Sequence, residues 1–383
     1  MAARSMGVEE ELLLVEAGTG RPLAVAESAL EAAENDRAPG HDKAGRERNG
    51  QPAEQDETDE ASLEFELQRQ QLETNSKPCH DLGELSEELR RGRAMAAKAA
   101  AAAGARVAAL ATSPVPVEPE LVRKGRYLKM ARAFGLTAHE QLTCGCHVHV
   151  GISSPDEGVA VLDRIRPWLP VLLALSANSP FWQGQDSGYA SFRYQAWSRW
   201  PTAGPTDIFG TADAYQATVR RMVGTGTLLD SGMVYFDARL SEHYPTIEIR
   251  VADVCLYADD ALLIAALTRG LVETEARRWR SGSGAPGDRL ELLRLASWRA
   301  SRSGLDDALL NPLTGEPEPA RIAATALFEH VKDALDEAGD THAAGELLDA
   351  LLTRGNGATF QRGTRRTRGL SHMIDAAAEV TAR

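Results

Sequence analysis

Three short segments of the chain alternate polar and apolar residues with a period of two. They are residues 7–11, 144–150 and 246–251. Side chains two residues apart point to the same side of a β-strand, so each segment has one polar face and one apolar face. The apolar faces require a hydrophobic core. The sequence therefore predicts a sheet that is covered by a core on one side and carries charged groups on the other.

The polar faces combine carboxylate, imidazole and guanidinium groups in pairs: Glu9 with Glu11, His147 with His149, and Glu248 with Arg250. Neighbouring carboxylates on one face repel by roughly 3 kcal/mol at about 6 Å and an effective dielectric constant of about 20. Glu66 and Glu73 would add to this repulsion, which makes cations necessary. Oxygen-rich sites of this kind suit Mg²⁺ or Mn²⁺, whereas a tetrahedral zinc site has fewer carboxylates.

Each pair has a plainer interpretation when it is taken alone. A Glu-x-Glu pair on a strand is usually solvated, a His-x-His pair is more often structural or a weak metal binder, and a Glu-x-Arg pair is most often a surface ion pair. The three pairs occur together in this chain, each on a strand with an apolar reverse face. Their joint occurrence favours one shared metal-binding face.

The composition limits the class of protein. The chain has 383 residues, of which 43% are hydrophobic, and a net charge of −13. This is the composition of a globular protein, and the acidic charge argues against nucleic acid or an anionic membrane surface as a partner. No apolar run reaches the length of a membrane span, and no apolar signal region is evident at the N-terminus, so we expect a cytoplasmic protein. The four cysteines are expected to be reduced and buried.

The order of the elements predicts an α+β fold that is built on an antiparallel sheet, with helices on its outer side. Extended segments are expected at 7–15, 62–75, 107–111, 143–152 and 234–254. Helices are expected at 81–104, 121–134 and 156–178, the last with a kink at Pro167, and through most of the chain from residue 257 to residue 383.

Two polar segments are predicted to lack regular structure. Residues 34–61 show no apolar periodicity and are expected to form a flexible loop. Residues 355–369 are rich in glycine and arginine and are expected to form a loop within the helical C-terminal part. The whole chain, 1–383, is interpreted as one domain.

Longer motifs around the charged pairs resemble the second bacterial type of glutamate–cysteine ligase, a family also described as carboxylate–amine ligases. The matching segments are Gly7–Leu12, Gln71–Cys79, Gly145–Gly151, Ser187–Arg193, Arg199–Pro205 and Thr246–Asp253. They occur in the family's order and span most of residues 6–260. The run Arg-Trp-Pro-Thr-Ala-Gly-Pro at Arg199–Pro205 is the most specific.

The resemblance implies a fold and a reaction. The fold is a curved antiparallel sheet with a glutamine-synthetase-like active-site face. The reaction is ATP-dependent amide formation with Mg²⁺ or Mn²⁺ and small amino-acid substrates. In relatives, ATP phosphorylates the γ-carboxylate of glutamate, and the amine of cysteine attacks the acyl phosphate with release of ADP and phosphate.

The resemblance also assigns roles to residues of this chain. The positions that match metal ligands are Glu9, Glu11, Glu66, Glu73, His147 and Glu248. Glu64 is an alternative to Glu66, because the strand phase shifts between residues 66 and 73. Arg250 matches the arginine that neutralises the transferring phosphate, and with Glu73 it is the predicted catalytic group. His149 is expected to bind a metal or orient the nucleotide. Arg193 is expected either to hold a substrate α-carboxylate or to be a surface arginine beside core aromatic residues.

Several alternatives stay open at this point. The same chemistry can use another amine or another carboxylic acid. The fold can also serve as a metal- or nucleotide-binding module without turnover, or as a metal-dependent amide hydrolase that needs no ATP. The intact set of charged residues favours the ligase. The sequence leaves the amine, the number of metal ions and the formation of a homodimer undecided.

Overall fold

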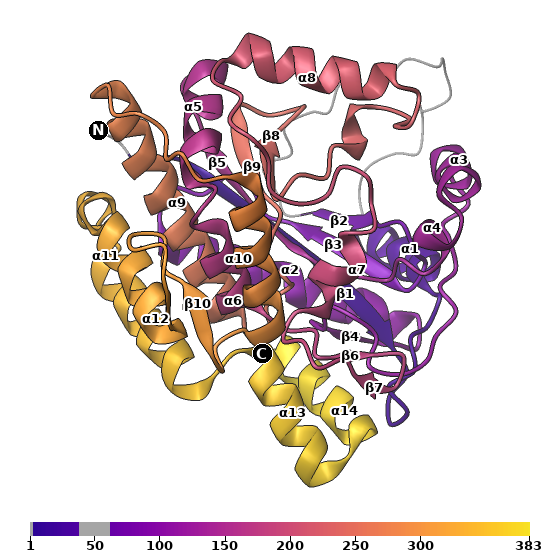
Figure 1. Ribbon diagram of the computed structural model, residues 1–383. Coiled ribbons are helices and arrows are strands. Elements are labelled where there is room, and N and C mark those ends of the chain that lie inside the picture. The colour runs from indigo at the N-terminus through magenta and orange to yellow at the C-terminus, as the bar shows by residue number, and fades with distance from the viewer. Residues whose placement is uncertain (1–2, 38–61) are drawn as a thin grey trace.

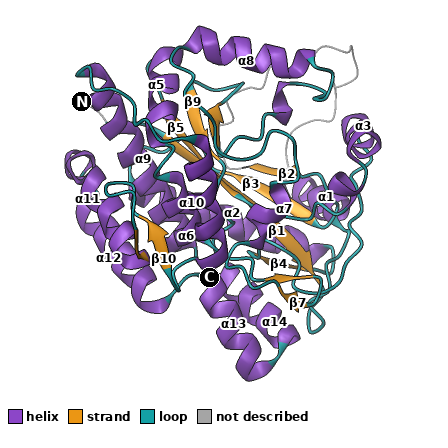
Figure 2. Ribbon diagram, in the orientation of Figure 1, coloured by secondary structure: helices purple, strands orange, loops and turns teal. Residues whose placement is uncertain are grey.

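The computed structural model describes residues 3–37 and 62–383. Within these residues, seven strands form one antiparallel sheet in the order β2-β3-β1-β5-β9-β8, with β4 also paired to β1. The strands of this sheet are β1 (Met6–Val15), β2 (Ser62–Phe65), β3 (Gln71–Asn75), β4 (Arg106–Ala108), β5 (Cys146–Gly151), β8 (Ala238–Leu240) and β9 (Thr246–Ile249). The sheet runs through the centre of the molecule, with helices around it (Figures 1 and 2). The predicted α+β class with an antiparallel sheet is confirmed.

The helices of the first two-thirds of the chain connect these strands. They are α1 (Ala26–Arg37), α2 (Leu82–Ala102), α3 (Gly125–Phe134), α4 (Leu136–His139), α5 (Pro155–Ile165), α6 (Leu169–Ser176), α7 (Phe192–Trp197), α8 (Ala212–Gly224) and the short 3₁₀ helix η1 (Ser231–Met233). A small hairpin of β6 (Phe181–Trp182) and β7 (Gln185–Asp186) precedes α7. The predicted kink at Pro167 is confirmed as a break, because α5 ends at Ile165 and α6 begins at Leu169.

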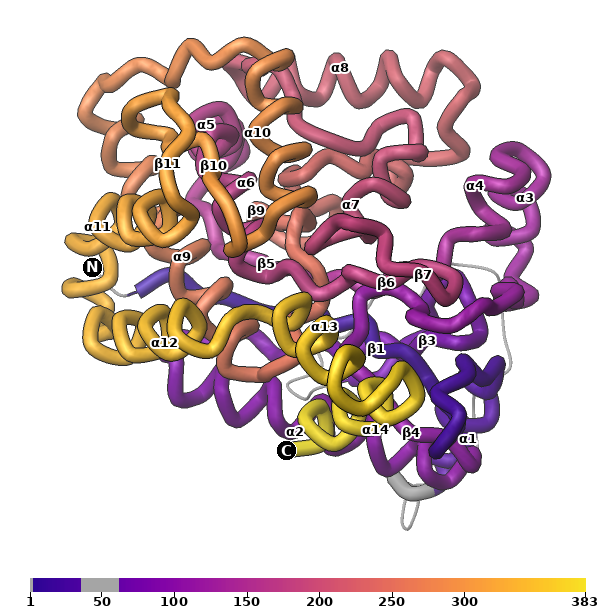
Figure 3. The backbone as a smooth tube through the Cα atoms, turned by 60° about the horizontal axis from the view of Figure 1, so that its bottom comes forward, coloured from indigo at the N-terminus to yellow at the C-terminus, as the bar shows by residue number. Residues whose placement is uncertain are grey.

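The last third is mainly helical, as predicted. It contains α9 (Ala258–Arg280), α10 (Leu290–Ser303), α11 (Ala320–Ala338), α12 (Thr341–Arg354), α13 (Gly357–Arg368) and α14 (Leu370–Thr381), with a hairpin of β10 (Ala308–Leu310) and β11 (Pro317–Pro319). Helices α13 and α14 lie side by side and project from the rest of the molecule (Figures 1 and 3). None of the helices in the described part of the chain is long and apolar enough to cross a membrane.

Two of the predicted loops need comment. The loop predicted at 355–369 is wrong, because residues 357–368 form α13, which Asn356 caps by accepting a hydrogen bond from the Thr359 amide. Two of the glycines that suggested a loop, Gly355 and Gly369, flank this helix with positive φ angles, whereas Gly357 and Gly363 lie within it. Of the loop predicted at 34–61, residues 34–37 belong to α1, and residues 38–61 lie outside the described residues.

The apolar face of the sheet packs on helices, as the alternation predicted. Val8, Val148 and Ile249 are fully buried on this face. They share one core with Leu263 and Leu267 of α9. At roughly 25 cal/mol per Å² of buried apolar area, this core is the main stabilising contribution to the central strands. It fixes which side of each strand turns toward solvent, and therefore where the polar side chains gather.

One acidic residue of the first motif points into this core. Glu10 lies between Glu9 and Glu11 and therefore faces the opposite side of β1, where its side chain is 1% exposed. Arg93 of α2 binds both of its carboxylate oxygens, at 2.6 and 2.9 Å, and also donates to the backbone carbonyls of Cys255 and Leu256. The ion pair thus ties β1 to α2 and to the segment that leads into α9.

We expect Arg93→Met to lower the free energy of unfolding by about 3–5 kcal/mol, because the buried Glu10 carboxylate loses its partner. Urea unfolding followed by circular dichroism measures this change. The exposed pair of Lys332 and Glu329 provides the control, and Lys332→Ala should change stability by less than about 1 kcal/mol. Equal effects of the two substitutions would show that the buried pair contributes no more to the free energy of unfolding than the exposed pair.

Candidate active site

The register of the central strands places the polar residues directly opposite one another. The cross-strand pairs are Glu11 with Glu73, Glu9 with His147, His149 with Glu248, and Glu248 with Arg239. Paired residues in an antiparallel sheet project from the same face. The three motifs, of which the first and last are more than 200 residues apart along the chain, therefore form one continuous polar surface across β3, β1, β5, β9 and β8.

This surface is the floor of a cavity of about 280 Å³. The cavity is lined by every predicted metal ligand and by the predicted nucleotide- and phosphate-binding residues: Glu9, Glu11, Glu66, Glu73, His147, His149, Glu248 and Arg250. The structure therefore brings together all but one of the predicted site residues. Glu66 lies just beyond the end of β2, whereas the alternative, Glu64, is exposed and does not line the cavity.

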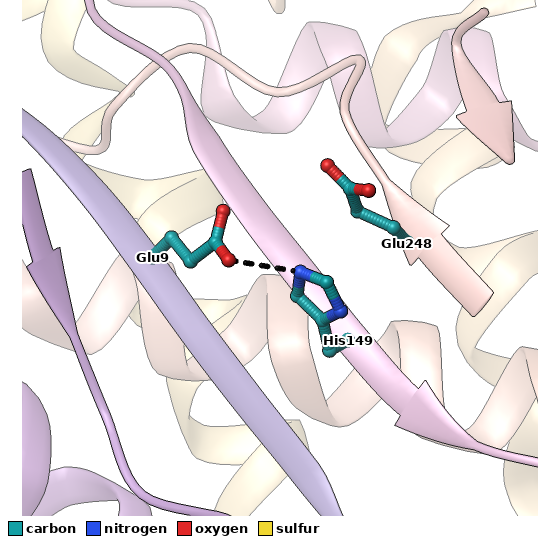
Figure 4. A group of neighbouring side chains, drawn as sticks. All are labelled: Glu9, His149 and Glu248. Atoms are coloured by element: carbon teal, nitrogen blue, oxygen red, sulfur yellow. Dashed lines mark ion pairs between the residues drawn. The ribbon is translucent and has the colours of Figure 1, made fainter. Parts of the chain in front are cut away.

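A first group of possible metal ligands consists of Glu9, His149 and Glu248, whose ligand atoms all lie within 4.8 Å of one another (Figure 4). The Nε2 atom of His149 lies 3.1 Å from a Glu9 oxygen, and its Nδ1 atom lies 3.0 Å from the Thr246 hydroxyl. Burial acts to lower the pKa of His149, but the Glu9 and Glu248 carboxylates outweigh burial and raise it. Two strands and one hydroxyl group thus fix the orientation of this imidazole ring.

A second group consists of Glu11, Glu66 and Glu73, again with one oxygen of each within 4.8 Å of the others. Burial and the adjacent Glu11 carboxylate raise the pKa of Glu66 to about 8. Burial, together with Glu9, Glu66 and Glu11, raises the pKa of Glu73 well above its usual range. These carboxylates therefore retain protons near neutral pH when no cation compensates their charge.

His147 lies between the two groups. Its Nδ1 atom is 3.0 Å from Glu9, and its Nε2 atom is 3.9 Å from Glu11 and has no hydrogen-bond partner among the described residues. Burial and the nearby Arg250 guanidinium lower the pKa of His147, so the ring is neutral at pH 7. If Nδ1 donates to Glu9, the lone pair of Nε2 is available to a ligand.

Glu248 is flanked by two arginines. Arg250, the residue that follows β9, forms an ion pair with it, and the Nε atom of Arg239 of β8 lies 2.6 Å from one of its oxygens. Burial would raise the pKa of Glu248, but the two guanidinium groups hold it well below its usual range. Arg250 lies within 6.0 Å of the ring centres of Trp197 and Tyr235, which form part of the cavity wall. This end of the cavity is consequently rich in positive charge and suits an anionic group.

Arg193 is the predicted site residue that the structure places elsewhere. Its side chain is buried and does not line the cavity. The guanidinium group lies on the same side of the sheet as His147, 3.4 Å from the carbonyl oxygen of Arg250 and 5.7 Å from the ring centre of Trp197. It occupies the space left by Gly145, since a Cβ atom there would meet its Nη2 atom at 2.3 Å. Arg193 is therefore neither at the surface, as one alternative expected, nor in the lining of the cavity, as the other required.

Sequence reasoning missed residues that reach the cavity from other segments. Arg239 extends the polar floor by one strand, and the alternation Ala238-Arg239-Leu240 was the signal that could have found it. Arg126 and Tyr127 enter from α3, which carries no recognisable motif. Arg126 forms a two-point ion pair with Asp230, at 2.7 and 2.8 Å, so that α3 is joined to the segment before η1 beside the cavity.

The fold and floor define a class: an antiparallel-sheet protein with an acidic, imidazole- and arginine-containing site for a small anionic ligand. The family model of "Glutamate-cysteine ligase family 2 (GCS2)" matches residues 5–378. The chain belongs to this family, and the predicted resemblance is confirmed.

Relatives and solved structures agree with this assignment. The chain is 52% identical to a Streptomyces avermitilis protein named "Putative glutamate--cysteine ligase 2-1", over 94% of both chains, and 51% identical to a protein of the same name from Paenarthrobacter aurescens, over 94% of this chain and 90% of the relative. The crystal structure of glutamate–cysteine ligase from Francisella tularensis in complex with AMP has a similar fold, with a TM-score of 0.68 at 12% identity over 100% of this chain and 89% of that one.

The raised pKa of Glu66 predicts a pH-dependent stability. In the unfolded chain this carboxyl group titrates near pH 4.3, whereas in the folded chain it keeps its proton until about pH 8. Between these values the folded state binds more protons, so this group lowers stability as the pH rises. In chelator-treated protein, we expect the Tm of Glu66→Gln relative to wild type to rise between pH 5 and pH 8 by on the order of 3 °C.

Differential scanning calorimetry across this pH range measures the effect. Glu64→Gln is the matched control, because Glu64 lies two residues away and is exposed. Its Tm should follow the wild-type curve. A Glu66→Gln curve parallel to that of wild type would show that Glu66 is not protonated in the folded protein at neutral pH.

Proposed function

We propose that the protein is an ATP- and Mg²⁺-dependent carboxylate–amine ligase that joins the γ-carboxyl group of glutamate to the amine of cysteine through an acyl phosphate. The observation that carries the proposal is the gathering of six carboxylates, three imidazoles and three arginines in the lining of one cavity. Membership of the glutamate–cysteine ligase family supports the reaction class, and the AMP bound to the Francisella tularensis enzyme supports the use of a nucleotide. A cytoplasmic location and a single domain stay predictions.

The donor set fits divalent cations. Two groups of three side chains each offer ligand atoms within 4.8 Å of one another, and most of these atoms are carboxylate oxygens, which Mg²⁺ and Mn²⁺ prefer. The unpartnered Nε2 atom of His147 and the raised pKa values of Glu66 and Glu73 are what a preformed cation site shows without its cation. We infer that these groups hold the metal ions, which, when bound, neutralise phosphate oxygens during phosphoryl transfer.

The arginines have a separate role in the proposed reaction. A guanidinium group can hold a phosphate oxygen pair in a fixed, two-point geometry. Arg250, and with it Arg239, would stabilise the charge on the γ-phosphoryl group as it passes from ATP to the γ-carboxylate of the amino acid. The amine of the second substrate then attacks the acyl carbon, phosphate leaves, and the nitrogen loses a proton. No serine or cysteine nucleophile is required.

A substrate panel tests the proposed function. The protein is incubated with ATP, Mg²⁺ and glutamate together with each of the twenty amino acids, and the release of ADP and of amide product is measured. We expect turnover with cysteine. Turnover with another amine would support the ligase reaction and show that cysteine is not the acceptor. ATP binding without turnover would indicate a binding module and not an enzyme. Amide cleavage without ATP would indicate a hydrolase.

Substitution of single carboxylates tests the site. We expect Glu73→Gln and Glu248→Gln each to lower kcat by about 100-fold or more, because each removes a charge that positions the reacting phosphate. Circular dichroism should show that both variants fold; the Tm of Glu73→Gln should not fall below that of wild type, whereas Glu248→Gln should lower the Tm because Arg239 and Arg250 lose a buried partner. Glu64→Gln, which faces Glu73 across the β2–β3 pair, is the control and should retain near-wild-type turnover. Turnover close to wild type in the first two variants would remove those residues from the site.

A further inference from the structure

A buried carboxyl group, that of Asp253, lies three residues after Arg250 and has no part in the reaction as proposed so far. Asp253 is 0% exposed and does not line the cavity. One of its oxygens accepts hydrogen bonds from the Asn178 amide, at 2.8 Å, and from the Ser179 hydroxyl, at 2.7 Å. The other oxygen accepts from the Ser191 hydroxyl, at 2.8 Å. Because donors reach both oxygens, the orientation of the buried group is fixed.

The two serines connect Asp253 to the first turn of α7. Ser191 is the N-cap of α7, and its hydroxyl oxygen accepts a hydrogen bond from the Tyr194 amide. The Ser179 hydroxyl oxygen accepts one from the Arg193 amide, at 2.9 Å. Each hydroxyl group therefore donates its single proton to the carboxyl group and accepts from α7, which fixes its direction. The start of α7 is thus attached to Asp253 at two points.

Two side chains of this turn hold the backbone of Arg250. The Arg193 guanidinium group lies 3.4 Å from the carbonyl oxygen of Arg250. The Tyr194 hydroxyl donates to the carboxyl group of Asp237, at 3.0 Å, and the backbone carbonyl of Asp237 accepts from the Arg250 amide, at 2.9 Å. Helix α7 therefore reaches the carbonyl group of Arg250 directly and its amide through Asp237.

Arg250 requires this support because it lies just beyond the end of a strand. Strand β9 ends at Ile249, and the residue pairs that join β9 to its two neighbours also end there, with Val148 on one side and Ala238 on the other. The backbone of Arg250 consequently depends on contacts outside the regular ladder. A displacement of about 1 Å in a group that positions reacting atoms can lower a rate by about 100-fold.

We propose that Asp253 is a positioning residue for Arg250. It fixes the start of α7, and α7 in turn fixes the backbone from which the Arg250 side chain extends into the cavity. The proposal rests on the proposed function, because it takes Arg250 as the group that stabilises the transferring phosphate. Since Asp253 acts only through Arg250, its loss should lower kcat more than it changes the KM for ATP or glutamate.

Asp253→Asn tests this link. The amide keeps one oxygen for Asn178 and Ser179 but places an NH₂ group opposite Ser191, whose hydroxyl loses its acceptor. We expect kcat to fall by about 10-fold and both KM values to change by less than about 2-fold. Asp163→Asn is the matched control, because Asp163 is also buried and accepts two backbone hydrogen bonds, at 2.8 Å each, away from the cavity. Its kcat should stay within about 2-fold of wild type.

A double-mutant cycle separates positioning from a general loss of folded protein. In an Arg250→Gln background, Asp253→Asn should lower kcat by less than about a further 2-fold, because the group that it positions is gone. A purely structural role would lower the activity by the same factor in both backgrounds and would overturn the proposal. Ser179→Ala, which removes only the hydroxyl group between Asp253 and Arg193, is a milder second variant. It should lower kcat by about 3-fold, again only when Arg250 is present.

Hydrogen–deuterium exchange needs no turnover and therefore distinguishes failure of this proposal from failure of the proposed function. We expect Asp253→Asn to speed exchange of the Arg250 amide by about 10-fold, while peptides from α9 exchange as in wild type. Unchanged exchange at Arg250 would overturn the proposal even in an active ligase. Faster exchange at Arg250 in a protein without ligase turnover would support the link between the two residues and contradict the proposed function alone.

Discussion

Repulsion between carboxylates that share one face of a sheet is the constraint on which the rest of this structure depends. The floor of the cavity balances that repulsion in two ways. Glu9 and Glu248 stay ionised because His149, Arg239 and Arg250 compensate them. Glu66 and Glu73, which lack such partners, are held in their protonated forms. A divalent cation that binds Glu66 and Glu73 would therefore displace their protons.

Packing contacts of the same strands offset the unfavourable free energy of this charge repulsion. The buried apolar residues of β1, β5 and β9 pack on α9, and Glu10 with Arg93 ties β1 to α2. On the polar side, Arg193 fills the space that Gly145 leaves next to His147 and lies against the backbone of Arg250. These contacts hold the strands in register although the side chains on the other face would favour separation. Arg193 therefore has a positioning role for the floor in this structure, without contact with the cavity.

The sequence predicted what depends on alternation and missed what depends on tertiary contact. A period of two fixes which residues share a strand face, so Glu9, His147 and Glu248 were found together without coordinates. The choice of Glu66 over Glu64 depends on where β2 ends, which local pattern does not determine. Helix α13 was missed because its glycines and threonines have low helix propensity, and contacts such as the packing of Arg365 on Phe181 outweigh that propensity.

The cavity residues that the sequence did not predict lie mostly in the segments between the strands. The floor comes from strands, and its charges follow from the motif, whereas the walls come from the segments between strands: Tyr127 and Met130 of α3, Trp197 of α7, Trp200, and Tyr235 before β8. Under the proposed function, the floor performs phosphoryl transfer and the walls contact the acceptor. Substitutions in the walls can then change the amine while the chemistry stays intact, because the charges that stabilise the transferring phosphate belong to different residues on different elements.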